Sequence, residues 1–480
     1  MTLAIHGNLD KTLGLTSSDN YYCRAHIAPN MNVNYLKYLP NFVRNKLAGR
    51  HSLQSALGNF GWLLADRGLR LGVGLVVGVW IARYLGPQRF GLFSFAAAFA
   101  ALFSAIATLG LDSIVIRELA KHPERKDILM GSAFVLKLLG STFAVLLAVL
   151  AIFIMRHGES LTIWLVSLAA AGFLFQSLSV IDFYFQSKVR SKYTVLAAGA
   201  AFILITLVKI ALLLMSASLI YFAWAGLAEL ALSGSFLIMA YRLDRNQIRS
   251  WHYDRGVASH LLKDSWPLIF ASFAILIQAR IDQVMLGNMI GNEEVGQYSA
   301  AMRLLEVVSV VPVIIVSTLS PHVARAKLIS EALYRRRLLE VYRAMTITFL
   351  LVAIPTLFFG GQIVQFVFGS EYKRAGILLS LFSIRLFFAN FGVAKTLFIT
   401  NESLFRYSLM TAIVGVAINI AGNYILIPLY RSEGAIIASI ISFSVTTFVI
   451  DIFYARTRVN LRLMLLAVIR PLSFRSNTEK

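Results

Sequence analysis

Eight basic side chains lie inside long apolar stretches of this sequence, where they could bind an anion. They are Arg67, Arg70, Lys137, Lys209, Arg280, Arg303, Arg385 and Lys395. A charge at bilayer depth is costly unless it is paired or hydrated, so each one is a functional hypothesis by default. The arginine guanidinium presents a planar fork of donors that matches phosphate oxygens. We therefore predict a cationic binding site formed by five of them: Arg67, Arg70, Lys209, Arg280 and Arg303.

Carboxylates at the same depth could couple transport to an ion. The pKa of such a group is set by desolvation and by neighbouring charges. Asp66, Glu229 and Asp282 are the candidates. A structural role is the alternative, because Asp66 and Arg70 are four residues apart on one helix face and Arg280 could pair with Asp282 or Glu306. A passive mechanism without a coupling ion fits the sequence equally well.

Other chemistry has little support in the sequence. The eight histidines are scattered without metal-ligand spacing, and the single cysteine, Cys23, cannot form an intrachain disulfide. No Gly-x-x-x-x-Gly-Lys-Ser/Thr loop, nucleophile elbow or catalytic carboxylate pair occurs. We predict no catalytic residue, no metal site and no cofactor, and hence a transporter rather than an enzyme.

The elements that position these charges are apolar blocks. Of the 480 residues, 58% are hydrophobic and only 14% are charged, against about 25% charged in soluble domains. A run of about 20 apolar residues crosses the hydrocarbon core as a helix. We predict an all-α polytopic membrane protein with twelve spans: 58–82, 90–111, 129–155, 162–186, 194–215, 219–241, 266–287, 297–320, 345–368, 377–400, 408–428 and 434–455.

The net charge of +21 is explained by topology rather than by nucleic acid binding. Lys and Arg gather in cytoplasmic loops. One alternating set of loops and termini holds 31 of these residues and the other set holds six. This split places both termini in the cytoplasm. The outer loops are too short for the substrate-handling domain of a membrane glycosyltransferase or polymerase. The basic tail after Arg456 could lie on anionic membrane lipids.

One ten-residue pattern occurs twice, 205 positions apart. It covers Leu85–Ser94 and Ile290–Ser299, and its two glycines suit a tight turn with positive φ. Two bundles of six helices related by a pseudo-two-fold axis along the membrane normal would hold a site between them. The predicted parts are a cytoplasmic leader (1–57), an N-terminal lobe (58–241), a linker (242–265), a C-terminal lobe (266–455) and a basic cytoplasmic tail (456–480).

Several short segments, in order, resemble one family of transporters. They are Ala82–Pro87 with Phe90-Gly91, Leu109–Leu111 with Val115–Glu118, Ile281–Leu286, Gly296–Ala301, Pro312, Pro321, Phe368–Tyr372, Asn423–Pro428 and Gly434–Ala438. Over roughly residues 35–455 the chain resembles the polysaccharide-transporter branch of the multidrug/oligosaccharidyl-lipid/polysaccharide exporter superfamily, which comprises O-antigen and exopolysaccharide flippases. Lipid-II flippases of the same superfamily typically carry two extra C-terminal helices, so twelve predicted spans and a tail favour the polysaccharide-transporter branch over that one.

The resemblance implies a function. It predicts alternating access that moves an undecaprenyl-pyrophosphate-linked oligosaccharide, a repeat unit of lipopolysaccharide O-antigen, capsule or exopolysaccharide, across the bacterial inner membrane. The implied partners are that lipid-linked oligosaccharide, membrane lipids and polysaccharide polymerase or chain-length machinery. Two alternatives stay open. A multidrug exporter of the same fold would favour an anionic cavity, whereas the spans hold eight basic and five acidic residues. A non-transporting component of an export complex is the other.

Overall fold

The computed structural model describes residues 51–471, with side chains for residue 59 and from residue 61 onward. By its contacts the chain divides into two compact units, Met1–Gly58 and Asn59–Lys480. Everything below concerns the described part of the second unit. Most of the predicted leader (1–57) and the last part of the predicted tail (472–480) lie outside the described residues.

The described residues are mostly helical and include no strand, which confirms the all-helical prediction. Apolar runs form the long helices, and turn residues separate them. The helices are α3 (His51–Leu102), α4 (Ser104–Thr108), α5 (Asp112–Lys121), α6 (Lys126–Met155), α7 (Ser160–Gln176), α8 (Val180–Ser187), α9 (Lys192–Leu214), α10 (Leu219–Leu243), α11 (Arg255–Met289), α12 (Asn292–Val308), α13 (Val310–Ile329), α14 (Glu331–Phe368), α15 (Lys373–Asn401), α16 (Phe405–Ser444), α17 (Ile450–Phe453) and α18 (Arg458–Ile469).

Ten helices in the described part are long and apolar enough to cross a membrane. Two of them, Gly61–Leu102 and Phe405–Phe453, each overlap two of the predicted spans. The backbone leaves the helical conformation inside both, at Gly86 (φ 68°, ψ 169°) and at Arg431 (φ 52°, ψ −128°). These breaks fall at the predicted connections between spans. The count of twelve spans stays a prediction.

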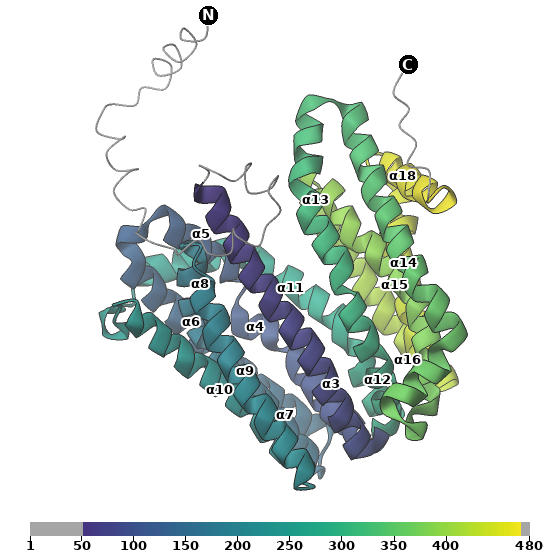
Figure 1. Cartoon of the computed structure of the whole chain (residues 1–480), viewed down its shortest axis with the longest axis horizontal. Coiled ribbons are helices and arrows are strands. Elements are labelled where there is room, and N and C mark those ends of the chain that lie inside the picture. The colour runs from purple at the N-terminus through teal and green to yellow at the C-terminus, as the bar shows by residue number, and fades with distance from the viewer. Residues whose placement is uncertain (1–50, 472–480) are drawn as a thin grey trace, which may run out of the picture. The chain divides into compact units, whose positions relative to one another are not determined.

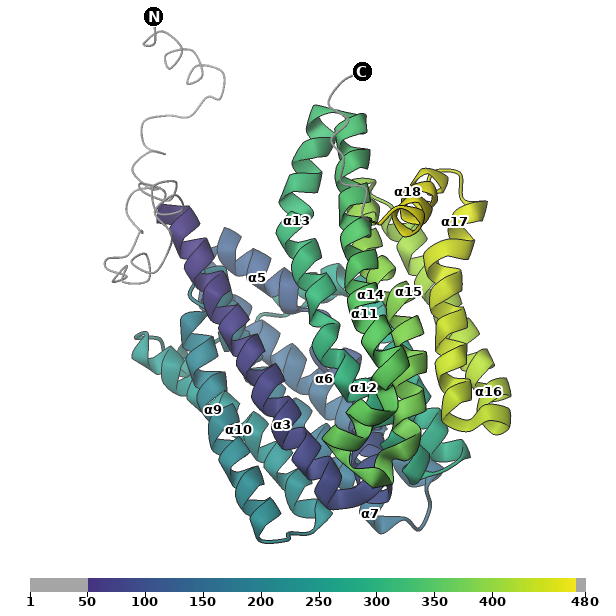
Figure 2. The ribbon, with the colours of Figure 1, turned by 45° about the vertical axis from the view of Figure 1, so that its right-hand side comes forward.

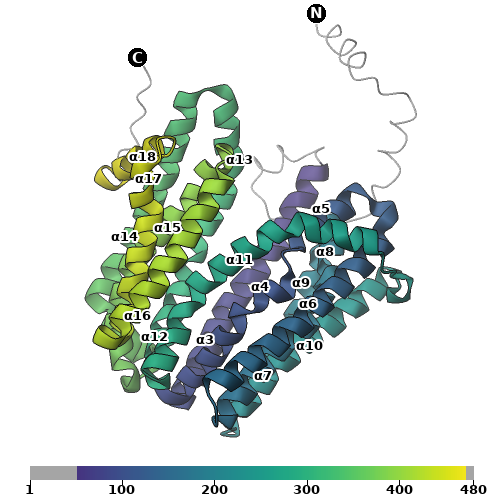
Figure 3. The same ribbon diagram turned by 180° about the vertical axis from the view of Figure 1, so that it is seen from behind.

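The hydrophobic core shows how the two lobes are joined. Figures 1 and 3 show α5–α10 gathered on one side and α12–α17 on the other, with α11 running from the first group to the second. One buried cluster combines Val77 and Phe95 of the first lobe with Tyr298 and Phe382 of the second. Away from it, each lobe has a core of its own, around Tyr241 in the first and around Tyr342, Phe391 and Met464 in the second. The lobes therefore share a core at one end only.

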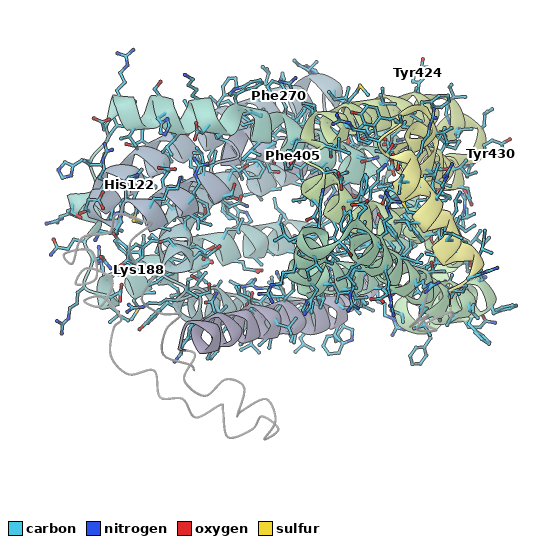
Figure 4. The ribbon with its side chains drawn as sticks, turned by 90° about the horizontal axis from the view of Figure 1, so that it is seen from above. His122, Lys188, Phe270, Phe405, Tyr424 and Tyr430 are labelled. Atoms are coloured by element: carbon cyan, nitrogen blue, oxygen red, sulfur yellow. The ribbon has the colours of Figure 1, made fainter. Side chains whose placement is uncertain are left out.

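We call the end with the shared core the turn end, because it holds both copies of the repeated pattern. The opposite end, with residues 244–254 between α10 and α11, is the linker end. Figure 4 views the molecule from the linker end, with His122 and Lys188 on the first-lobe side and Phe405 on the second-lobe side. Helix α18 lies across the helices at this end and packs against α14 and α17 (Figure 2).

The glycines of the repeated pattern have two different roles. Gly86 (φ 68°) and Gly291 (φ 132°) adopt the predicted positive φ, which glycine tolerates because it has no Cβ. The prediction is wrong for the second glycine of each copy. Gly91 and Gly296 are helical, and each brings the backbone against another segment: a Cβ on Gly91 would overlap Asn292, and one on Gly296 would overlap Pro87. Close backbone contact, not turn geometry, requires these two glycines.

Candidate functional site

The first half of α3 carries three of the predicted site residues: Asp66, Arg67 and Arg70. Figure 1 shows this helix between the two groups of helices. Its side chains are largely exposed; Trp62 is 38% and Leu69 is 39% exposed. A Cβ on Gly68 or Gly72 would meet no atom within 4 Å. This part of α3 therefore borders open space on most of its surface, and seen from the linker end the helix runs along one edge of the molecule (Figure 4).

Four of the predicted residues form one charge network in the first lobe. Arg70 contacts Asp66 at 3.0 Å and Glu229 at 3.9 Å, and Lys209 contacts Glu229 at 2.8 Å. The guanidinium of Arg70 also lies 5.1 Å from the centre of the Phe202 ring. Two cations face two carboxylates here, so the network is neutral as a whole. The helical spacing predicted the first pair; the contacts that join α3, α9 and α10 needed the tertiary structure.

Arg67 differs from its neighbours because it forms no ion pair with any described residue. Its side chain is exposed on α3. The i±3 and i±4 positions on the same helix hold no acid, as the sequence indicated. A guanidinium in this position keeps all its donors for a ligand or for water.

Arg303 of α12 crosses from the second lobe to the first. Its Nη2 donates to the backbone oxygen of Gly74 at 3.4 Å, and a Cβ on Gly78 would overlap its guanidinium. No described carboxylate forms an ion pair with it. Gly74 and Gly78 are one helical turn apart on α3 and leave a notch that accepts the guanidinium. Arg280 instead contacts Glu306 at 3.4 Å within the second lobe.

Asp282 lies at the centre of a buried polar cluster in the second lobe. Its side chain is buried, with 2% exposure. It accepts hydrogen bonds from Tyr298 Oη at 2.7 Å, Asn423 Nδ2 at 2.7 Å and Ser439 Oγ at 2.5 Å. Its described neighbours include no cation within ion-pair distance. All three donors are neutral.

The same cluster contains acceptor oxygens without a described hydrogen-bond partner. The amide oxygens of Asn419 and Asn423 are buried without a described hydrogen-bond partner, and Asn419 Nδ2 donates to Ser439 Oγ at 3.3 Å. A carboxylate beside unpartnered amide oxygens is suited to hold a proton or a small cation. Sequence reasoning found Asp282 but missed its partners. A signal for the cluster was the pair Asn419 and Asn423, four residues apart in an apolar block, of which Asn423 contacts Asp282.

The remaining basic residues of the spans have structural partners. Lys137 contacts Asp112 at 3.3 Å and Ser179 at 2.8 Å. Lys395 contacts Asp451 at 2.6 Å and donates to the backbone oxygens of Thr446 and Thr447. Those two residues belong to the π-helical turn Val445–Val449. Arg385 lies against two aromatic rings, 5.6 Å from Phe382 and 5.1 Å from Phe443. The described residues include no group of three or more His, Cys, Asp and Glu side chains that could hold a metal ion.

A family model described as "Polysaccharide biosynthesis protein" matches residues 56–327. The search of curated proteins found no match.

Solved structures share the fold at low sequence identity. An inward-facing multidrug resistance MATE family transporter of the MOP superfamily has a TM-score of 0.64 at 16% identity, over 82% of this chain and 95% of that one. The lipid II flippase MurJ in an inward closed conformation has a TM-score of 0.57 at 13% identity, over 83% and 92%. A MOP superfamily transporter from Pyrococcus furiosus, whose binding pocket is described as having reverse polarity, has a TM-score of 0.55 at 16% identity, over 87% and 95%.

Proposed function

Because the chain belongs to the polysaccharide biosynthesis protein family and has the fold of MOP superfamily transporters, we propose that it is a flippase for lipid-linked oligosaccharides. Its substrate is an undecaprenyl-pyrophosphate-linked repeat unit of O-antigen, capsule or exopolysaccharide. It moves this molecule across the bacterial inner membrane by alternating access. The linker end and both termini face the cytoplasm, in keeping with the distribution of Lys and Arg.

The observation that carries the proposal is the presence of two arginines to which no described carboxylate forms an ion pair, where the lobes begin to separate. Arg67 is exposed on α3, and Arg303 of α12 reaches α3 from the second lobe. A pyrophosphate is a dense anion, and two guanidinium groups from two lobes can bind its oxygens from two sides. The lipid tail stays in the bilayer while the sugars occupy the space between the lobes.

The paired cations act as a second layer of the same site. Arg70 and Lys209 both contact Glu229, and Arg280 contacts Glu306. These pairs are partly exposed, with side-chain exposures of 21–46%. Ion pairs of this exposure are weak. A phosphate can therefore compete with the carboxylates for the basic partners. All five predicted residues therefore contribute to binding the pyrophosphate, and Arg67 and Arg303 contribute most because no described carboxylate pairs with them.

Asp282 is the proposed site of ion coupling. Of the three candidate carboxylates, Asp66 and Glu229 contact basic side chains, whereas Asp282 has only neutral donors around it. A buried carboxylate without a counter-ion is the group whose charge a bound proton or small cation changes most. Binding there would alter how α11, α12 and α16 pack, because the cluster joins all three.

The runner-up is a multidrug exporter, which the MATE-like fold favours. A cationic drug would need an unpartnered, accessible carboxylate between the lobes. Asp66 and Glu229 are neutralised by Arg70 and Lys209, and Asp282, which has no described counter-ion, is buried inside the second lobe. The proposal for an anionic substrate therefore stands above the drug exporter. Polymerase or chain-length machinery would receive the flipped repeat unit.

The test is export in a host that depends on this chain. Deletion should leave lipid-linked repeat units on the inner leaflet and abolish surface polysaccharide, and the intact chain should restore both. Arg67→Ala with Arg303→Ala should fail to restore export at normal expression. Arg249→Ala is the matched control, because Arg249 lies in the linker, outside the spans. Drug efflux without any effect on surface polysaccharide would favour the runner-up instead.

A further inference from the structure

The two copies of the repeated turn contact each other at the turn end. A Cβ on Gly91 would overlap the backbone oxygen of Asn292, and a Cβ on Gly296 would overlap the backbone oxygen of Pro87. Pro87 and Asn292 are equivalent positions of the two copies, and so are Gly91 and Gly296. Each copy thus presents its glycine to the other copy's helix start. The contact is self-complementary, as a two-fold interface requires.

One arginine of the first lobe fastens this contact from the side. Arg156 lies between α6 and α7, and only 8% of it is exposed. Its guanidinium donates to the backbone oxygen of Gly287 and to Asn292 Oδ1 at 3.3 Å, both in the second lobe. It also lies 4.2 Å from the centre of the Phe95 ring. Glu159 holds the same guanidinium on the first-lobe side at 2.9 Å.

Further ties between the lobes also end on backbone oxygens. Tyr372 Oη donates to the oxygen of Ala82 at 2.7 Å, and Arg83 donates to the oxygen of Phe366. Donors and acceptors of this kind can exchange their partners for water when two surfaces part. At Gly91 and Gly296 backbone meets backbone, whereas the Phe95 side chain packs against Gly287 and belongs to the core that both lobes share. The hydrogen bonds to backbone oxygens therefore hold the closed lobes together in addition to that core.

We propose that these contacts form a latch that closes the turn end, and that Arg156 is the residue that sets the balance between closed and open states. We use the word latch for Gly91, Gly296, Asn292, Gly287 and Arg156. The proposal rests on the alternating access of the proposed function, since release on this side requires the lobes to part here. It does not depend on the chemistry of the substrate.

The ratio of closed to open molecules depends on the hydrogen bonds that Arg156 makes across the interface. In the closed state it has two acceptors in the second lobe; in the open state only Glu159 and water remain. Each hydrogen bond to a charged group is typically worth a factor of about ten or more in an equilibrium constant. Removal of the guanidinium should therefore raise the ratio of open to closed molecules at least about tenfold. A Cβ at Gly91 should raise it as well, because the backbones can no longer approach.

The test measures the separation of the lobes directly, without substrate. Cys23 is the only cysteine, so spin labels can be placed in a Cys23→Ser background at Ser218→Cys and Ser370→Cys. These positions are exposed and lie near the turn end in the first and second lobes. Double electron–electron resonance measures the distance between the two spin labels. In lipid nanodiscs it should give one short distance for the parent. Arg156→Ala and Gly91→Ala should each add a population at longer distance.

Two matched controls separate the latch from general damage. Arg431→Ala removes an arginine that pairs with Glu294 inside the second lobe, at 3.6 Å. Gly226→Ala adds a Cβ where no atom lies within 4 Å. Both should keep the parent distribution. Asn292→Ala, which removes one acceptor without changing charge, should give an intermediate shift and serves if Arg156→Ala does not fold.

A parent-like distribution for folded Arg156→Ala, or for Asn292→Ala in its place, together with folded Gly91→Ala, would overturn the latch. A shift equally large in the controls would do the same. Neither result bears on the substrate, because no substrate is present. Conversely, loss of polysaccharide export by Arg67→Ala with an unchanged closed state would support the proposed function and leave the latch to be judged by the distances alone.

Discussion

Replacement of Asp282 separates the proposed coupling role of the second-lobe cluster from its role in packing. Asp282→Asn keeps the shape of the side chain and removes its charge. The new amide oxygen can still accept from Tyr298 and Ser439. Its NH2 group would face Asn423 Nδ2, but Asn423 has an unpartnered amide oxygen and can turn to accept. We therefore expect a loss of at most about 1 kcal/mol in unfolding free energy, that of one typical hydrogen bond.

Asp282→Leu provides the matched contrast. It leaves the donors of Tyr298, Asn423 and Ser439 buried without an acceptor. An unsatisfied buried donor costs about 1–3 kcal/mol, so the three together should destabilise the protein by on the order of 3 kcal/mol or more. Thermal unfolding in detergent, followed by the fluorescence of a thiol-reactive dye on a buried introduced cysteine, measures both variants against the parent.

The assay for coupling is transport in proteoliposomes under imposed gradients of protons or of sodium. The parent should respond to one of the two gradients, and Asp282→Asn should transport at a rate that neither gradient changes. Asp282→Glu tests whether a carboxylate restores the response. If Asp282→Asn kept the gradient response of the parent, the coupling role would be refuted. If Asp282→Leu were as stable as the parent, the account of the buried cluster would be wrong.

Three further predictions concern other charges. Lys395→Met should destabilise the protein by about 3–5 kcal/mol, because Asp451 is fully buried and would lose its counter-ion; Lys395→Met with Asp451→Leu should recover most of that loss in thermal unfolding. Arg67→Ala should weaken binding of a pyrophosphate-bearing lipid at least about tenfold by microscale thermophoresis, with Arg67→Lys intermediate. Although burial opposes it, hydrogen bonds from Thr162 and Arg156 lower the pKa of Glu159 below its ordinary 4.5. The stability that ionised Glu159 gives the folded protein is thus fully present above pH 4.5 and is lost as the pH falls through the lowered pKa; thermal unfolding should show this loss, and Glu159→Gln should abolish it.

The sequence predicted the parts of the fold that depend on local pattern. Continuous apolar runs specify long helices whatever their neighbours, and the repeated pattern located the two turns with Gly86 and Gly291 at positive φ. The Asp66–Arg70 pair followed from helical spacing alone. Each of these features depends on residues that lie close together in the sequence.

Contacts between distant helices could not be predicted in this way. Glu229 could have paired with any basic residue at its depth, and only the packing of α9 and α10 on α3 assigns it to Lys209 and Arg70. Arg156 escaped notice because it lies outside the apolar blocks, where an arginine is ordinary. The second glycines of the repeat were misinterpreted, since the sequence does not reveal that the two copies contact each other.

The most direct measurement of the central proposal is flipping by the purified chain in liposomes that contain an undecaprenyl-pyrophosphate-linked oligosaccharide. A glycan-specific enzyme added outside counts the molecules that reach the outer leaflet. The proposal predicts faster appearance with the intact chain than in empty liposomes, and a rate near that of empty liposomes for Arg67→Ala with Arg303→Ala. Undiminished flipping by that double variant would contradict the cationic site, and no flipping by the intact chain would contradict the function itself.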